Sequence, residues 1–475
     1  MRTATRRRLA MAGFLLLLGS GIIAQAQVTR TRTIHSMTTN DRFGSAIAGV
    51  GDLDGDGYDD LAIAAPLASI VETQSGTVYT WFGGPSGMTV GPMLLGWSAD
   101  EQFGRQVASA GDFNGDGAPD IAVCTAFDVK LYFGGPSFDA VADARLEVFQ
   151  VPMAGNPHFC TALTSTDLDG DGLTDVLVGM ERVDDRPNTA DHRGRVYVYF
   201  GRVPDWQGQT LFEDLALEGP AGNPLDLFGA ALAGSRDLDG DGIGDAVVGA
   251  PAISRAFLVF GSTDRAAIGS RIMELADSSG NSPELGRSVA VGDVNRDGAD
   301  DIAVGAANGD WAQAEGWSAV LYYGGARLDD QVDRTYRAPL SSPQSEPQPQ
   351  PLAADPGWYG RAVSIVDLDN NGYGDLIVGQ PLWSPETGDP SSVSPYIGRI
   401  FDTSTGERFE GDDLLDELGF ALTNLGDVDG DGLEDLGAGT GGHADADGGY
   451  VRIYLGYLRD TQHPPCPKCP DIDGQ

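Results

Sequence analysis

Length and charge already narrow the classes of protein to which this chain can belong. It has 475 residues, with 70 acidic against 30 basic side chains and a formal net charge of −40. Such acidity argues against nucleic-acid binding, which requires basic surface, and disfavours anionic membranes unless metal ions bridge the two.

Residues 1–26 are typical of a secretory signal peptide. Arg2 and the run Arg6-Arg7-Arg8 give a positive start, residues 9–23 are apolar, and Ala24-Gln25-Ala26 fits a cleavage site. The apolar run is shorter than the ~20 residues that cross a bilayer, and no second apolar segment follows. We therefore expect an exported protein, extracellular, on the cell surface or in the periplasm, with no membrane span after signal cleavage.

Residues 27–459 repeat one unit of roughly 60 residues seven times. Each unit opens with an aromatic residue or Leu followed by a small residue: Phe43-Gly44, Phe103-Gly104, Phe159-Cys160, Phe228-Gly229, Leu285-Gly286, Tyr359-Gly360 and Leu418-Gly419. A short alternating run, an Asp-rich loop, an apolar run such as Leu61–Ala65 and a β-rich segment such as Val78–Gly83 follow. Short β runs separated by Gly, Pro, Asn and Asp indicate an all-β protein.

Three strands and a variable fourth, in seven copies, predict a seven-bladed β-propeller; a β-solenoid is the alternative, but its turns are shorter. The last repeat ends after three strands, so we expect residues 29–37 to supply its outer strand and close the ring. Residues 184–193, 340–356 and 383–396 interrupt the repeats and predict mobile loops.

The four cysteines fall into two pairs. Cys466 and Cys469 lie in the tail, residues 460–475, which we expect to be disordered, and they favour a small local disulfide. Cys124 and Cys160 lie in neighbouring repeats, where they are either bonded to each other or two buried free thiols.

The Asp-rich loops predict one calcium site in each blade. Side-chain oxygens stand at positions one, three, five and nine of each loop, and position seven offers its carbonyl oxygen. The predicted ligands are Asp52, Asp54, Asp56, Tyr58, Asp60; Asp112, Asn114, Asp116, Ala118, Asp120; Asp167, Asp169, Asp171, Leu173, Asp175; Asp237, Asp239, Asp241, Ile243, Asp245; Asp293, Asn295, Asp297, Ala299, Asp301; Asp367, Asp369, Asn371, Tyr373, Asp375; and Asp427, Asp429, Asp431, Leu433, Asp435.

Several oxygens in a flexible arrangement favour Ca²⁺ over Mg²⁺, and up to seven ions would neutralise much of the negative charge. An EF-hand is excluded because position twelve is apolar and lies in a β run. The alternative is that these are unliganded Asp-Gly turns between strands. Asn114, Asn295 and Asn371 each replace a carboxylate and predict weaker sites, and Arg296 beside its ligands predicts that loop five is the weakest.

The Phe-Gly opening, the Asp-x-Asp-x-Asp-Gly-x-x-Asp loop and a closing Gly249-Ala250-Pro251 resemble FG-GAP repeats, which build the N-terminal propeller of integrin α subunits. The resemblance extends over residues 29–458. It implies calcium loops on one face of the propeller and ligand contacts on the other. We do not expect an integrin-type β subunit as partner, because the sequence shows no leg domains, membrane helix or cytoplasmic tail.

The partner that we expect is an extracellular protein or glycan. Four loop tryptophans, Trp97, Trp311, Trp358 and Trp383, are candidate ligand contacts, although each could instead pack between blades. No Gly-x-Ser-x-Gly or His-Glu-x-x-His motif is present, and the five histidines are scattered. The sequence thus favours a calcium-stabilised protein-interaction or adhesion module, with a carbohydrate-binding propeller as the alternative and a hydrolase or lyase less favoured.

Overall fold

A computed structural model describes the chain over residues 31–36, 38–148, 159–182, 194–203, 208–219, 226–277, 282, 284–307, 318–337, 358–383, 397–411, 417–441 and 449–458. The predicted signal peptide, the tail with Cys466 and Cys469, and nearly all of the three predicted mobile loops lie outside these residues. No helix in the described ranges is long and apolar enough to cross a membrane.

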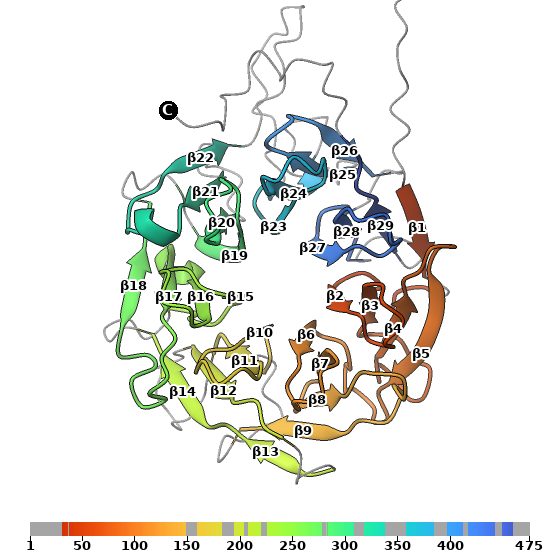
Figure 1. The fold of residues 1–475 in the computed structure, drawn as a ribbon. Coiled ribbons are helices and arrows are strands. Elements are labelled where there is room, and N and C mark those ends of the chain that lie inside the picture. Colours follow the sequence, from red (N-terminus) through yellow and green to blue (C-terminus); the bar gives the residue numbers. More distant parts are fainter. Residues whose placement is uncertain are drawn as a thin grey trace, which may run out of the picture.

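Seven sheets, antiparallel except for one added strand, stand around a central axis, so the chain is a seven-bladed β-propeller (Figure 1). The innermost strands are β2 (Ile47–Gly51), β6 (Val107–Gly111), β10 (Ala162–Thr166), β15 (Ala231–Ser235), β19 (Leu285–Gly292), β23 (Val363–Val366) and β27 (Ala421–Gly426). The second strands are β3 (Asp60–Ala65), β7 (Asp120–Cys124), β11 (Asp175–Met180), β16 (Asp245–Ala250), β20 (Asp301–Ala306), β24 (Asp375–Trp383) and β28 (Asp435–Gly439). Position twelve of every acidic loop lies in one of these second strands, as a β-hairpin calcium loop requires and an EF-hand does not.

The third and fourth strands complete each blade. The third strands are β4 (Thr77–Phe82), β8 (Val129–Tyr132), β12 (Arg195–Tyr199), β17 (Arg255–Val259), β21 (Ser318–Tyr322), β25 (Ile397–Asp402) and β29 (Tyr450–Tyr454). The outer strands of blades one to six are β5 (Thr89–Leu95), β9 (Ala144–Glu147), β14 (Leu215–Glu218), β18 (Ile272–Leu275), β22 (Arg334–Arg337) and β26 (Arg408–Glu410). Two short 3₁₀ turns, η1 (Pro251–Ile253) and η3 (Gly325–Arg327), are the helical elements in the described ranges.

The seventh blade takes its outer strand from the other end of the chain. Strand β1 (Thr31–His35) pairs antiparallel with β29, from Thr31 opposite Tyr454 to His35 opposite Tyr450. Figure 1 shows β1 beside β29, next to the first blade. The strand occupies the position expected for residues 29–37, although it is shorter.

Blade two has a strand that the repeat pattern did not indicate. Strand β13 (Thr210–Phe212), from the third-to-fourth connection of blade three, pairs parallel with β9 and makes a five-stranded sheet. Leu211 of this strand is buried in the apolar cluster between blades two and three. A three-residue run with one buried side chain has too little periodicity to be recognised as a strand.

The spaces between neighbouring blades are filled by apolar clusters, one at each of the seven junctions in the described part of the chain. The aromatic residue or Leu that opens each repeat is buried at these junctions, and the glycine after it lies against the preceding blade. A Cβ at Gly249 would lie 2.0 Å from the carbonyl oxygen of Gly286, so the two backbones meet without side chains.

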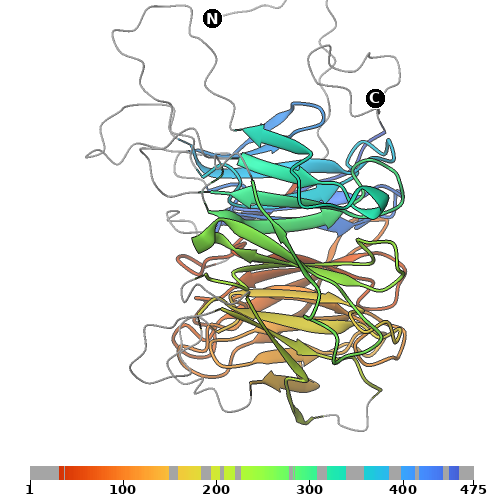
Figure 2. The same cartoon turned by 90° about the vertical axis from the view of Figure 1, so that its left-hand side faces the viewer.

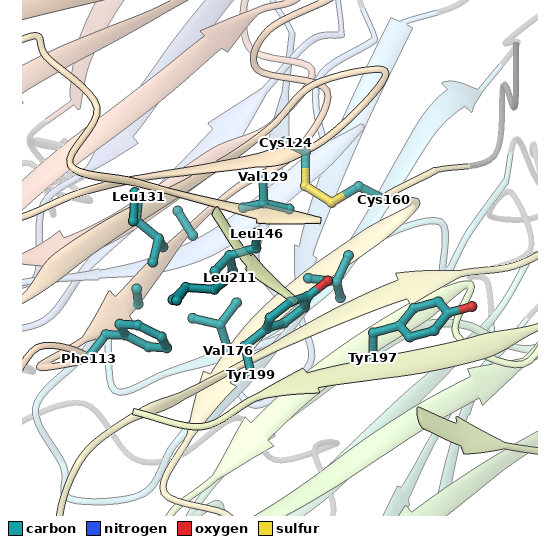
Figure 3. Packing of buried hydrophobic residues seen from close by; sticks show 14 of the residues in the cluster. Phe113, Cys124, Val129, Leu131, Leu146, Cys160, Val176, Tyr197, Tyr199 and Leu211 are labelled. Atoms are coloured by element: carbon teal, nitrogen blue, oxygen red, sulfur yellow. A yellow bond between two sulfur atoms is a disulfide. The ribbon is translucent and has the colours of Figure 1, made fainter. Parts of the chain in front are cut away.

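At one junction this close glycine contact is replaced by a disulfide. Cys160 stands where the other repeats have glycine, with a φ of 50°, and is bonded to Cys124 at the end of β7, with a Cα–Cα distance of 6.0 Å. Figure 3 shows the bond at the edge of the cluster that contains Leu211 and Tyr199. The structure therefore contains the bonded pair of cysteines rather than two buried free thiols.

Candidate metal centres and the opposite face

All seven acidic loops lie on one face of the propeller, because each connects the first and second strands of its blade. We call this the loop face; it holds residues 52–60, 112–120, 167–175, 237–245, 293–301, 367–375 and 427–435. The opposite face, where the innermost strands begin, is called the entry face. The two faces are the two ends of the strands in the side view (Figure 2).

Each loop is folded by its own carboxylates. In loop one, Asp52 accepts the N–H of Asp56 at 2.8 Å and that of Gly57 at 2.9 Å, while Asp56 accepts the N–H of Tyr58 at 3.1 Å. The first two hydrogen bonds recur in all seven loops. Gly57 has a φ of 96°, so the turn requires glycine there.

This folding brings the side chains of positions one, three and nine together. In five loops, one carboxylate oxygen from each of the three lies within 4.8 Å of the other two; these are Asp52–Asp54–Asp60, Asp167–Asp169–Asp175, Asp237–Asp239–Asp245, Asp367–Asp369–Asp375 and Asp427–Asp429–Asp435. Loops two and five have Asn114 and Asn295 at position three, and the predicted carboxylates at position five lie outside these groups.

The donor set suits a hard divalent cation. Three negative charges at such separation repel one another unless a cation or protons neutralise them. In loop seven, Oδ1 of Asp429 is buried and accepts no hydrogen bond, a costly arrangement for a carboxylate oxygen that has no cation to bind.

Position nine also fastens the loop to the blade. Asp60 is fully buried and accepts the N–H of Leu53 at 2.8 Å and that of Gly83, at the end of the third strand, at 2.7 Å. The residue at position two, Leu53 here, is buried in all seven loops. Sequence reasoning overlooked position two, although its signal is plain: Leu, Phe or Val in all seven repeats.

Burial raises the pKa of every position-nine carboxyl group. It raises the pKa of Asp60 to about 7, with the backbone N–H of Gly83 opposing the shift. The same cause raises the pKa of Asp120 to about 8, those of Asp175, Asp301 and Asp435 to about 7, that of Asp245 to about 6, and that of Asp375 in the same direction. Without metal, the pKa values of these groups thus lie close to neutral pH rather than near 4.

Calcium binding is therefore expected to release protons. The ion requires the ionised carboxylate, so titration at pH 6.5 should release protons, and fewer at pH 8.5. Because the folded-state pKa values lie above the ordinary value near 4, the metal-free protein should lose stability as the pH rises from about 4 through 7. Calorimetry in two buffers of different ionisation enthalpy measures the release; equal observed heats in the two buffers at pH 6.5 would contradict it.

Two arginines on the loop face contact predicted ligands. Arg265, in the link between the third and fourth strands of blade four, contacts Asp169 and also donates to Asp171 at 3.1 Å, while Arg271 donates to Asp239 at 2.6 Å. Arg296 instead donates to the carbonyl oxygen of Asn371 in loop six, at 3.4 Å. Guanidinium groups thus also contact loops three and four, and the expectation that loop five binds most weakly stays a prediction.

Replacing Arg265 by Gln should raise the calcium affinity of loop three several-fold, because the ion no longer displaces a partly buried ion pair. Hydrogen exchange of the peptide containing residues 167–175, followed across a calcium titration, reports the midpoint. Arg408→Gln is the matched control, because Arg408 lies on the outer strand of blade six and pairs with Glu410 rather than with a predicted ligand. An unchanged midpoint in Arg265→Gln would mean that the contact has no influence on the ion.

The predicted tryptophans do not form one demonstrated patch. Trp97 follows β5 at the entry-face end of blade one and is 65% exposed. Trp358 precedes Tyr359 at the same face, but it packs against the cluster between blades five and six. Trp383 ends β24 at the entry face, with only its backbone described, and Trp311 lies outside the described residues.

Sequence reasoning missed a group of arginines at the centre of the entry face. Arg42, Arg105, Arg287 and Arg361 line a cavity of about 550 Å³ there. The signal was present, because three of them directly follow a Phe-Gly-like pair, but only the ring geometry brings them together.

The fold and the loops together define an all-β propeller with an acidic, calcium-type loop in every blade. Residues 43–81, 159–199 and 285–326 match the FG-GAP repeat family, and residues 112–178 match the FG-GAP-like repeat family. These matches show FG-GAP repeats in parts of the chain, which resembles the β-propeller of integrin α chains, as its sequence motifs predicted.

Curated relatives agree with this assignment. The chain is 38% identical to human integrin alpha-7 over 144 residues, which cover 29% of this chain and 12% of the relative. It is 41% identical to Xenopus laevis integrin alpha-5 over 114 residues, 22% of this chain and 11% of the relative. Human phosphatidylinositol-glycan-specific phospholipase D is 28% identical over 238 residues, 47% of this chain and 26% of the relative. The matches thus span a small part of each relative.

Proposed function

We propose that this protein is an exported, calcium-binding propeller that serves as a protein-interaction or adhesion module. The observation that supports it is the similarity of its repeats to those of integrin α chains, combined with one acidic loop per blade on a single face. In this proposal calcium stabilises each blade and the entry face binds the partner.

The contacts support different roles for the loop face and the entry face. Carboxylates on the loop face are engaged in folding the loops and fastening them to the third strands. The entry face has exposed Trp97 and the residues that precede and follow each Phe-Gly-like pair, which the repeat does not restrict to one residue type. An interface of this kind gains most of its affinity from a few aromatic and Arg side chains.

A cell-binding assay tests the proposal. The mature protein, labelled and loaded with calcium, should bind cells of the producing organism, lose binding in EGTA, and lose it when the cells are treated with protease. Trp97→Ala should weaken binding, whereas Val203→Ala, also exposed but on the loop-face side of blade three, is the control. Binding that survives protease but not glycosidases would favour the carbohydrate-binding alternative, and binding unaffected by EGTA would contradict the calcium-dependent module.

The phospholipase D among the relatives does not extend the proposal to catalysis. The match covers 26% of that protein, and it is compatible with shared repeats alone. In the described ranges, the groups of three close carboxylates belong to five of the acidic loops, whose chemistry suits ion binding.

A further inference from the structure

The entry-face cavity is the mouth of the central channel. Its volume is about 550 Å³, and it is continuous with a narrower space of about 230 Å³ lined by the innermost strands, since Arg287, Arg361 and Thr161 line both. The mouth is polar: besides the four arginines, its lining includes Glu181, Gln74 and Gln102.

The turn that opens each repeat explains why arginines meet there. The carbonyl oxygen of the residue before the Phe-Gly-like pair accepts a hydrogen bond from the backbone N–H of the residue after the pair. Arg287 N–H donates to Glu284 O at 3.2 Å, and Arg361 N–H donates to Trp358 O at 2.9 Å. The innermost strand begins at this turn, so the residue after the pair lies at the rim of the channel. Blades two, five and six place arginine at that position, and Arg42 joins them from the turn of blade one.

The mouth has a positive charge that the protein only partly neutralises. Glu181 is the acidic residue in its described lining, while Glu284 and Glu417 lie near Arg287 and Arg361. Burial, and then the charge of Arg287, lower the pKa of Arg361 to about 10. Its guanidinium stacks on Phe420 at 4.6 Å, and its buried Nε has no acceptor. A buried donor without an acceptor and neighbouring like charges are both stabilised by a bound anion.

We propose that the channel mouth binds the carboxylate of a small hydroxylated ligand, of the sugar-acid class. A planar guanidinium matches a carboxylate through two parallel hydrogen bonds. The amides of Gln74 and Gln102 supply donors and acceptors for hydroxyl groups. The cavity has the size of a small-molecule site, and a net charge of −40 repels a polyanion far more strongly than a ligand with one charge.

Calorimetry on the calcium-loaded protein tests the proposal, with sodium glucuronate as probe and glucose as its neutral counterpart. Glucuronate should bind one to one, and glucose at least tenfold more weakly. Arg361→Gln should weaken glucuronate binding at least tenfold. Arg287→Gln, at a similar place on the rim but without the contact to Phe420, should do the same if Arg361→Gln fails to fold. Arg408→Gln, on the outer strand of blade six, should bind as wild type, and melting curves check that each variant is folded.

Two results would overturn the assignment. The arginines serve only the internal packing of the mouth if glucuronate and glucose bind equally tightly, or if wild type and both rim variants bind glucuronate equally tightly. Tighter binding of N-acetylaspartate amide than of glucuronate would assign the mouth to an acidic side chain of a protein instead. Cell adhesion by a rim variant that no longer binds glucuronate separates this site from the proposed adhesion function.

Discussion

Chelation of calcium with EGTA should lower the melting temperature by about 20 °C. Each site, saturated at 100 times its dissociation constant, stabilises the fold by roughly 2.7 kcal/mol, so seven sites together supply about 19 kcal/mol. For a propeller of this length the entropy of unfolding is about 0.9 kcal/mol per degree, which converts that stabilisation to a shift of about 20 °C. Scanning calorimetry with calcium, with EGTA, and with calcium restored measures the shift and its reversal.

Variants separate ion binding from turn formation. Asp54→Asn removes one charge from the group formed with Asp52 and Asp60. Glu72→Gln, the control, removes one charge from an exposed side chain at the entry face of the same blade. The first should lower the melting temperature in calcium more than in EGTA. If neither EGTA nor Asp54→Asn changes the melting temperature, and the protein takes up no calcium, the loops are unliganded turns.

Loss of the disulfide between Cys124 and Cys160 should destabilise the propeller by about 3–4 kcal/mol. The bond closes a loop across 36 positions, and the loss of chain entropy in the unfolded state sets this magnitude. For a protein of this size the change corresponds to about 4 °C in melting temperature. The double variant Cys124→Ala/Cys160→Ala, followed by thermal melting in calcium, measures it.

The single variants give the decisive comparison. If the bond exists in solution, either single substitution costs nearly as much as both together, because each breaks the same bond. Two buried free cysteines would give a different result. The costs of the single substitutions would then be small and additive, and both thiols would react with a labelling reagent when the wild type is unfolded without reductant. Cys160→Gly restores the residue that the other repeats have and is the informative third variant.

The fold could be predicted from the sequence because the same repeat occurs seven times at a similar spacing. Apolar runs such as Leu61–Ala65, the Phe-Gly-like pairs and the spacing of the aspartates all recur, so local signals support one another. Strand β13 and the contact of Arg265 with Asp169 recur in no other blade, and periodicity therefore gives no sign of them.

The candidate sites likewise differ in how far the sequence alone predicts them. The ligands of the acidic loops are neighbours in sequence, and their grouping follows from one turn that hydrogen bonds fix locally. The channel mouth combines Arg42, Arg105, Arg287 and Arg361, which are up to 319 positions apart, and only the closure of the ring brings them together. Position nine lies between these cases: its carboxylate was predicted, but its raised pKa depends on burial by the finished blade.

Adjacent acidic loops are joined by backbone hydrogen bonds, which gives the metal sites a collective property. At four of the seven junctions, position eight of one loop donates its backbone N–H to the carbonyl oxygen of position one of the preceding loop: Thr174 to Asp112, Gly244 to Asp167, Gly374 to Asp293 and, across the seam from the seventh blade to the first, Asp59 to Asp427. An ion that orders one loop therefore orders part of its neighbour before a second ion arrives. We expect positive cooperativity in calcium uptake, with a Hill coefficient above one.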